Sequence, residues 1–128
     1  MSNFKSFHLD LTAGRTELHD ALNLTGAEVS LNNLPAGVSI PFVHAHTNNE
    51  ELYIVLSGEG VFFVDGEEFV VKAGDCVRVD PKGQRCLKAA DGTALRYLCI
   101  QTRKDSLQGY TMTDGVMSEE FVKPSWLK

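Results

Sequence analysis

Short apolar segments separated by regularly spaced glycines make up the middle of the chain. Gly58, Gly66, Gly74, Gly83 and Gly92 follow one another at intervals of eight or nine residues. The segments between them are rich in Val, Phe, Leu, Tyr and Ile, and strands of this length with breakers at this spacing are typical of a β-sandwich or barrel. The pattern therefore predicts an all-β protein.

A tight hairpin is predicted at Asp65 and Gly66. This dipeptide separates the apolar segments 61–64 and 69–71, and a two-residue Asp-Gly connection favours a turn with positive φ angles. Both segments, like residues 52–56, are apolar at odd and even positions, whereas a sheet with one wet face would alternate. We therefore expect the outer face to be covered by the N-terminal segment, the C-terminal tail or a second subunit.

Further elements are predicted before this region. Residues 16–22 carry apolar side chains at helical spacing and favour one or two helical turns. Residues 27–34 and 37–46 indicate strands, and Pro41 in the second of them favours an edge or bulge position. The predicted fold is therefore β-rich with few short helical turns.

The chain shows no internal linker, repeat or low-complexity segment. A length of 128 residues suits one hydrophobic core. We expect a single domain with its barrel over about residues 27–101. The extensions 1–26 and 102–128 are expected to pack on the barrel or on a partner.

Composition and charge limit the classes of partner. Hydrophobic residues make up 43% of the chain, and 12 Lys+Arg against 17 Asp+Glu give a net charge of −5. The cations are scattered, which argues against a nucleic-acid-binding surface or an anionic membrane surface. Lys5, His8 and Asp10 interrupt the stretch that a secretory signal would need, and the longest apolar run, 52–56, is far below the ~20 residues of a spanning helix.

The three cysteines agree with a reducing compartment. Cys76, Cys86 and Cys99 cannot all pair within one chain and form no Cys-x-x-Cys motif. Free thiols are therefore expected rather than a disulfide framework, and a cytoplasmic location is predicted.

Two histidines and a glutamate predict a metal site. His44 and His46 are at i and i+2 of the predicted strand, so their side chains share one face with Cα atoms ~6.5–7 Å apart. The polar stretch 47–50 can form a turn that reverses the chain and places Glu51 on a neighbouring strand. Two imidazoles and a carboxylate are typical of open divalent-metal sites. The alternatives are a half-exposed histidine pair and a solvated acidic turn at Glu50 and Glu51.

Residues 41–60 resemble the first motif of the cupin superfamily, G-x5-H-x-H-x3,4-E-x6-G. Four residues separate His46 from Glu51 and six separate Glu51 from Gly58. Glu51 rather than Glu50 therefore matches the metal-binding carboxylate of the motif. Residues 74–86 resemble the second motif, G-x5-P-x-G-x2-H-x3-N, and the whole resemblance covers about residues 37–100.

The resemblance implies a fold and a ligand set. It indicates a small, single-domain, conserved-barrel cupin with a double-stranded β-helix, or jelly roll, and a metal in the barrel mouth. His44, His46 and Glu51 are implied as ligands. The chain departs from the family where Cys86 replaces the third metal histidine and Ala90 replaces the asparagine. Six residues also separate Gly37 from His44, and six separate Gly74 from Pro81, whereas the motifs have five at both places.

The role of Cys86 stays open between two readings. A bound thiolate, together with a carboxylate and two neutral imidazoles, would balance a divalent ion, and its soft sulfur would favour Zn²⁺ in a closed site. If Cys86 is a small buried thiol instead, the remaining ligands leave open positions at which Fe²⁺, Ni²⁺ or Zn²⁺ could hold water or substrate.

These features predict a divalent-metal-binding protein that admits a small polar or carboxylate-bearing molecule. One alternative is a metal-dependent enzyme of dioxygenase or isomerase type, with Glu50 or Tyr53 assisting proton transfer. The other is a non-catalytic binding or sensing domain whose metal is structural or absent. Phe42, Arg85 and Gln101 are candidates for the cavity wall, with packing or exposure as their simpler uses, and a homodimer is expected. The fold alone does not fix the reaction.

Overall fold

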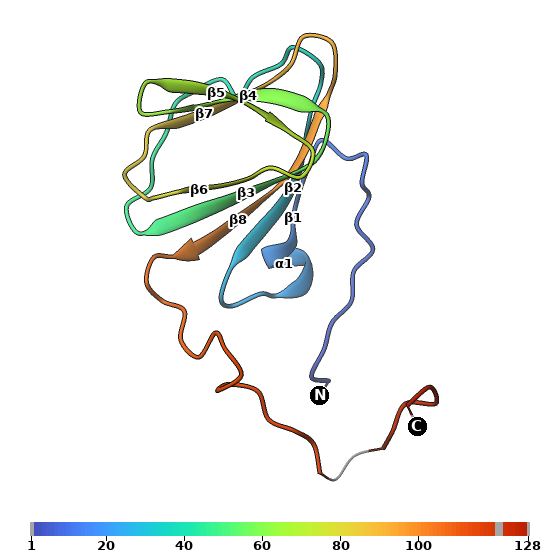
Figure 1. Ribbon diagram of the computed structural model, residues 1–128. Coiled ribbons are helices and arrows are strands. Elements are labelled where there is room, and N and C mark those ends of the chain that lie inside the picture. Colours follow the sequence, from blue (N-terminus) through green and yellow to red (C-terminus); the bar gives the residue numbers. More distant parts are fainter. Residues whose placement is uncertain (1, 120–121, 128) are drawn as a thin grey trace.

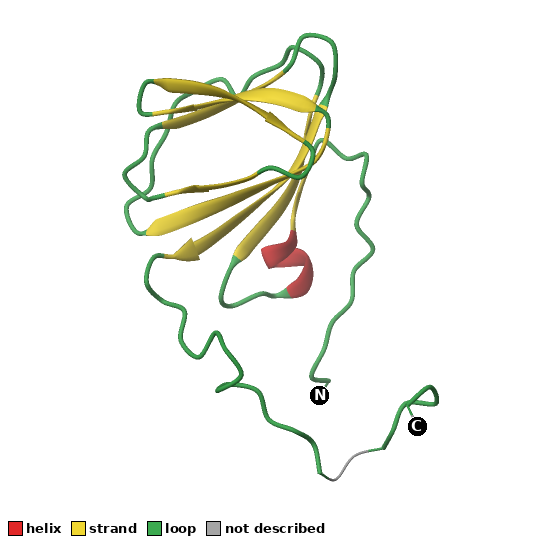
Figure 2. Ribbon diagram, viewed as in Figure 1, coloured by secondary structure: helices red, strands yellow, loops and turns green. Residues whose placement is uncertain are grey.

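Two antiparallel sheets face each other in the computed structural model, which describes residues 2–119 and 122–127 (Figures 1 and 2). The elements are β1 (Arg15–Glu17), α1 (Leu18–Leu22), β2 (Glu28–Leu34), β3 (Asn49–Ser57), β4 (Glu59–Val64), β5 (Glu67–Lys72), β6 (Cys76–Val79), β7 (Arg85–Ala89) and β8 (Leu95–Arg103). The larger sheet has the order β1-β2-β8-β3-β6 and the smaller one β5-β4-β7. The predicted all-β, double-stranded β-helix architecture is confirmed.

The predicted hairpin at Asp65 and Gly66 is confirmed. These two residues join β4 to β5 and have φ angles of 51° and 88°. The strands pair from Val64 with Glu67 at the turn to Glu59 with Lys72 at the far end. The turn requires positive φ at both central residues, which Asp tolerates and Gly adopts freely.

The strand predicted over residues 37–46 is wrong. This segment runs beside β7 and forms only two isolated bridges, Ser39 with Lys88 and His44 with Arg85. Pro41 lies between the bridges and has no N–H to donate, so regular pairing is interrupted there. The two predicted ligand histidines therefore lie on an irregular segment at the edge of the smaller sheet.

The interior between the sheets changes character along each strand. On β3, the inward side chains are Glu51, Tyr53 and Val55, in that order. The apolar end belongs to a buried core made of Tyr53, Val55, Phe62, Val71, Val79, Leu87, Ala89, Leu95 and Tyr97. The other end of the interior is polar and borders a cavity.

The two outer faces differ in how they are covered. Helix α1 contacts β2. On this strand Leu31 is completely buried, although it faces away from the interior that Ser30 and Asn32 face. Helix α1, none of whose residues is buried, thus contacts this part of the larger sheet, and a cover for the outer face of the strands over residues 52–71 stays a prediction. On the smaller sheet, Val70 is 70% exposed.

The segment after β8 runs away from the barrel (Figure 1). Its apolar side chains include Met112, Val116 and Met117, each about nine-tenths exposed. Among residues 2–119 and 122–127, no helix has the length and hydrophobicity needed to cross a bilayer.

Candidate metal centre

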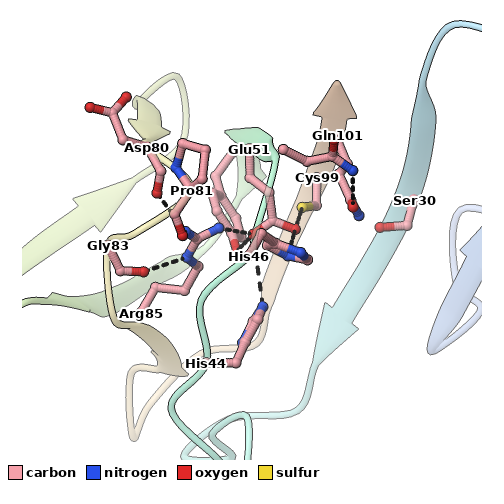
Figure 3. A network of polar contacts seen from close by, with 12 residues as sticks. Ser30, His44, His46, Glu51, Asp80, Pro81, Gly83, Arg85, Cys99 and Gln101 are labelled. Atoms are coloured by element: carbon pink, nitrogen blue, oxygen red, sulfur yellow. Dashed lines mark hydrogen bonds and ion pairs between the residues drawn. The ribbon is translucent and has the colours of Figure 1, made fainter. Parts of the chain in front are cut away.

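His44, His46 and Glu51 converge at the polar end of the barrel. Their potential ligand atoms all lie within 4.8 Å of one another. His46 Nε2 is 3.1 Å from Glu51 Oε2, and His44 Nε2 is 3.9 Å from Glu51 Oε1 (Figure 3). The bend after His46 carries the chain into β3 and places Glu51 opposite the histidines. The predicted spatial convergence of these three residues is therefore present.

The burial and the hydrogen-bond partners of the imidazole nitrogens show whether a metal ion fits this site. His44 Nδ1 is buried without a hydrogen-bond partner within the described parts of the chain, and His46 Nε2 is buried with the Glu51 carboxylate 3.1 Å away. A buried nitrogen without a partner costs free energy. Burial lowers the pKa of His44, so its imidazole is neutral, the form that binds metal. Two imidazoles and an adjacent carboxylate fit a divalent ion.

Arg85 forms an ion pair with the same carboxylate, that of Glu51. Its side chain is 1% exposed, and Nη1 lies 2.6 Å from Glu51 Oε1. Backbone carbonyls hold the rest of the guanidinium, with Nε donating to Gly83 and Nη2 donating to Asp80 and Pro81 (Figure 3). The loop between β6 and β7 therefore fixes a cation beside the histidine cluster.

Glu51 is ionised in this environment. Burial by itself would raise the pKa of its carboxyl, but hydrogen bonds from Tyr53 and Arg85, with the nearby positive charges, outweigh it and lower the pKa. Tyr53 donates to Oε1 at 2.6 Å, and burial raises the pKa of this phenol. Burial and the Glu51 charge raise the pKa of Cys99 to about 12, so its thiol stays protonated and donates to Oε2 at 3.4 Å.

The charges of the cluster cancel before any ligand binds. Glu51 contributes one negative charge and Arg85 one positive charge, and imidazoles that bind a metal do so in the uncharged form. A divalent ion would therefore leave an excess of two positive charges in a largely buried site. An anionic ligand would remove that excess, because Coulomb interactions are strong where water is scarce.

Cys86 is not part of the converging group. Its Sγ donates to the Ile40 carbonyl at 3.2 Å, and it borders the cavity beside the cluster. On β7, the buried positions are Arg85, Leu87 and Ala89, so the alternation of a strand turns Cys86 to the other face. Arg85 rather than Cys86 reaches Glu51, and Cys86 as a ligand stays a prediction.

The two predicted proton-transfer residues are placed differently. Tyr53 lies in the cluster, where it donates to Glu51. Glu50 is on the opposite face of β3, pairs in register with Thr102 and does not line the cavity. The structure therefore brings only Tyr53 to the site.

A cavity of about 490 Å³ extends from the cluster across the inner face of the larger sheet. The three candidates for its wall, Phe42, Arg85 and Gln101, line it. Sequence reasoning missed its far wall, where Ser30 and Asn32 on β2 are buried polar residues. The signal was a polar side chain at every second position from residue 28 to residue 32.

Comparison with protein families and curated sequences gives one family. The family model described as "Cupin domain" matches residues 31–101. An uncharacterized protein of Methanocaldococcus jannaschii is 35% identical over 66 residues, covering 52% of each chain. A Thermotoga maritima protein named "Oxalate-binding protein" is 34% identical over 67 residues, covering 52% of this chain and 54% of that protein. The chain thus spans about half the length of the curated relatives it matches.

A solved structure resembles the whole fold. The crystal structure of a cupin protein from Bacteroides fragilis superposes with a TM-score of 0.89 at 50% sequence identity. The match covers 92% of this chain and 99% of that one. The likeness therefore extends beyond the barrel that the family model covers.

Proposed function

The chain belongs to the cupin domain family, and from that premise we propose that it binds one divalent metal ion together with a small organic anion. His44, His46 and Glu51 would hold the ion. The observation that carries this proposal is the convergence of two imidazoles on an ionised carboxylate, with one potential ligand atom of each residue within 4.8 Å of the others. When bound, the ion would supply Lewis-acid or redox chemistry.

The neighbouring side chains support an anionic ligand. Arg85 fixes the orientation of Glu51 through Oε1 and adds a positive charge next to the histidines. Tyr53 and Cys99 keep their protons and act as donors to the carboxylate. The name of the Thermotoga maritima relative, an oxalate-binding protein, agrees with a carboxylate ligand. If the protein is an enzyme, we propose a metal-dependent reaction of dioxygenase or isomerase type.

A non-catalytic binding domain is the second candidate. The observation that favours it is the ion pair at 2.6 Å between Arg85 and Glu51, because it balances the carboxylate without a metal. In that form the cavity would capture an anion directly and the histidines would serve as neutral hydrogen-bonding groups.

Metal analysis of the purified protein tests the leading candidate. We expect one zinc, iron or nickel ion per chain, or stoichiometric uptake of Zn²⁺ on titration. His46→Ala should abolish uptake, whereas His19→Ala serves as the matched control because His19 is half exposed and pairs with Asp20 outside the cluster. No ion in the wild type and no uptake on titration would favour the non-catalytic candidate.

Cys86→Ser addresses the open question of the fourth ligand. Because the thiol hydrogen bonds to the Ile40 carbonyl, we expect the variant to bind Zn²⁺ with unchanged stoichiometry. Loss of the ion in this variant would return Cys86 to the ligand set and indicate a closed structural site.

We also propose a cytoplasmic homodimer. The thiols of Cys76, Cys86 and Cys99 are all free, which supports a reducing compartment. The exposed Val70 on the smaller sheet, with Met112 in the C-terminal segment, supports burial against a second copy. Light scattering at micromolar concentration should give twice the monomer mass, and cell fractionation should recover the protein with the cytosol.

A further inference from the structure

Two carboxylates line the cavity in a single row of the larger sheet. Within the described residues, Glu28 and Glu51 are the acidic side chains of the cavity wall. Gln101 on β8 is the register partner of both, with Glu28 on its β2 side and Glu51 on its β3 side. Glu28 and Glu51 therefore lie two strand spacings apart, roughly 10 Å between backbones.

The charge of Glu51 is balanced, whereas that of Glu28 is not. Arg85 Nη1 lies 2.6 Å from Glu51 Oε1. Glu28 Oε1 accepts a hydrogen bond only from a neutral group, the backbone N–H of His19, at 3.0 Å. Across residues 2–119 and 122–127, no basic side chain forms an ion pair with Glu28, and no donor is bonded to its Oε2. The second oxygen is therefore available to a ligand.

Two arginines border this region without neutralising Glu28. Arg15 lines the cavity, but its register partner is Asn32, roughly 13 Å along β2 from Glu28. Its Nε is also paired with Glu17 Oε1 at 3.2 Å. Arg103, at the end of β8, is exposed and does not line this cavity. The Glu28 end of the cavity is therefore negatively charged.

The metal end has the opposite sign once an ion is bound. Arg85 cancels the charge of Glu51 there, so a divalent ion held by uncharged imidazoles leaves two excess positive charges. Both ends border one cavity of about 490 Å³. A ligand is complementary to this cavity when it carries an anionic group at one end and a cationic group at the other.

We propose that Glu28 binds an ammonium group, and that the ligand is a small amino acid whose carboxylate lies at the metal centre. This inference rests on the proposed function. The ammonium group would donate to Glu28 Oε2, while the His19 N–H stays on Oε1. Oxalate carries no cation and would leave Glu28 unpaired.

The spacing of the row limits the length of the ligand. Gln101 separates the two ends without altering their charges, and its Oε1 accepts from Asn49 Nδ2 at 2.7 Å, which holds the neutral amide in place. An α-amino acid carries both charged groups on one carbon, so it is too short to reach from the metal centre past Gln101 to Glu28. The ligand class is therefore an amino acid with a longer carbon chain between its charged groups.

Calorimetric titration of the Zn²⁺-loaded protein with γ-aminobutyrate and butyrate tests this assignment. The two ligands have the same carbon chain and differ by one ammonium group. We expect γ-aminobutyrate to bind about 5- to 20-fold more tightly than butyrate, between the values for an exposed ion pair and for a buried charged hydrogen bond.

Glu28→Gln removes the charge and keeps the shape of the side chain. Its amide oxygen can still accept from the His19 N–H, so the contact between β2 and the start of α1 is retained. The ratio of the two affinities should fall to about 1, and butyrate should bind at least as tightly as in the wild type.

Two further variants keep the test independent of folding. Glu68→Gln removes one negative charge from an exposed position on β5 and should leave the ratio intact. Glu28→Asp keeps the charge on a shorter side chain, so an intermediate ratio is expected. Circular dichroism confirms that each variant is folded before titration.

Zinc uptake, measured first on the same samples, separates this inference from the proposed function. Normal uptake with equal wild-type affinities for the two ligands would overturn the role of Glu28 alone, as would a ratio that survives Glu28→Gln. Normal uptake with no binding of either ligand would contradict the small organic anion and the amino acid together. Absence of uptake in the wild type would contradict the metal proposal and, with it, a ligand that bridges the metal and Glu28.

Discussion

The two ends of the barrel interior are equally buried and chemically opposite. At the closed end, Val55 is 3% exposed and Leu95 is fully buried. At the open end, Glu51 is 4% exposed and Arg85 is 1% exposed. The same strand, β3, supplies both Val55 and Glu51. Strand alternation decides which side chains face inward, and the residue type then decides whether a position builds stability or a site.

The two ends also differ in free space. At the closed end, a Cβ on Gly60 would lie 2.4 Å from the Lys88 carbonyl oxygen and 2.8 Å from Leu95 Cδ2. At the open end, the interior leaves a cavity of about 490 Å³. Close packing without voids stabilises the fold, whereas the cavity leaves space for a ligand.

The largest effect is expected when the buried ion pair is broken. Arg85→Met leaves the Glu51 carboxylate buried without its cation and should lower the free energy of unfolding by about 3–5 kcal/mol. The same change removes a positive charge beside the histidines, so the affinity for Zn²⁺ should rise. Urea unfolding in the presence of a chelator measures the first effect, and zinc titration measures the second.

Arg78→Met provides the matched control for this pair of effects. Arg78 is exposed and pairs with Asp80 at 3.2 Å outside the cavity, so its loss should change the unfolding free energy by less than about 0.5 kcal/mol. A weaker zinc affinity in Arg85→Met would show that Arg85 supports the metal rather than opposing it.

A comparable loss of stability without any change in metal binding is expected at the closed end. Leu95→Ala removes a fully buried side chain and should cost about 2–5 kcal/mol. Because Leu95 lies away from the cluster, the zinc affinity of the folded variant should equal that of the wild type. The control is Leu107→Ala, since Leu107 is 75% exposed. Impaired zinc binding in Leu95→Ala would mean that the two ends are coupled.

The smallest effect is expected at Tyr53, which lies between the ends. Tyr53→Phe keeps the ring that packs edge-on against Phe62 at 4.8 Å and removes only the hydrogen bond to Glu51. The expected loss is about 1–2 kcal/mol, measured by urea unfolding against the exposed-site control Tyr110→Phe. A loss as large as that of Leu95→Ala would show that the phenol oxygen does more than hold the carboxylate.

Much of the fold could be predicted because local signals decided it. The Asp65-Gly66 turn needs positive φ angles, and only a few residue types adopt them, so the hairpin was evident. The strand predicted over residues 37–46 failed because Pro41, which was expected to mark an edge or bulge within a strand, leaves only isolated bridges on either side of it. Its hydrogen bonds are made instead at scattered points along β7, as from the Ile40 N–H to the Leu87 carbonyl.

The site could be predicted only in part. The spacing of His44, His46 and Glu51 was sufficient to place three groups at one point. The motif match drew attention to Cys86, whose role as a ligand stays a prediction, and did not reveal that strand alternation turns Arg85 inward on β7. The charged Lys88 was the available signal: a lysine faces solvent, and Cys86 shares its face of the strand.

Anomalous scattering from crystals grown with Zn²⁺ tests the central claim most directly, because it locates the ion and its ligands together. We predict one peak between His44, His46 and Glu51, at about 2.0–2.2 Å from an imidazole nitrogen of each histidine and from a carboxylate oxygen. A peak elsewhere, or none at this cluster with zinc present in excess, would contradict it.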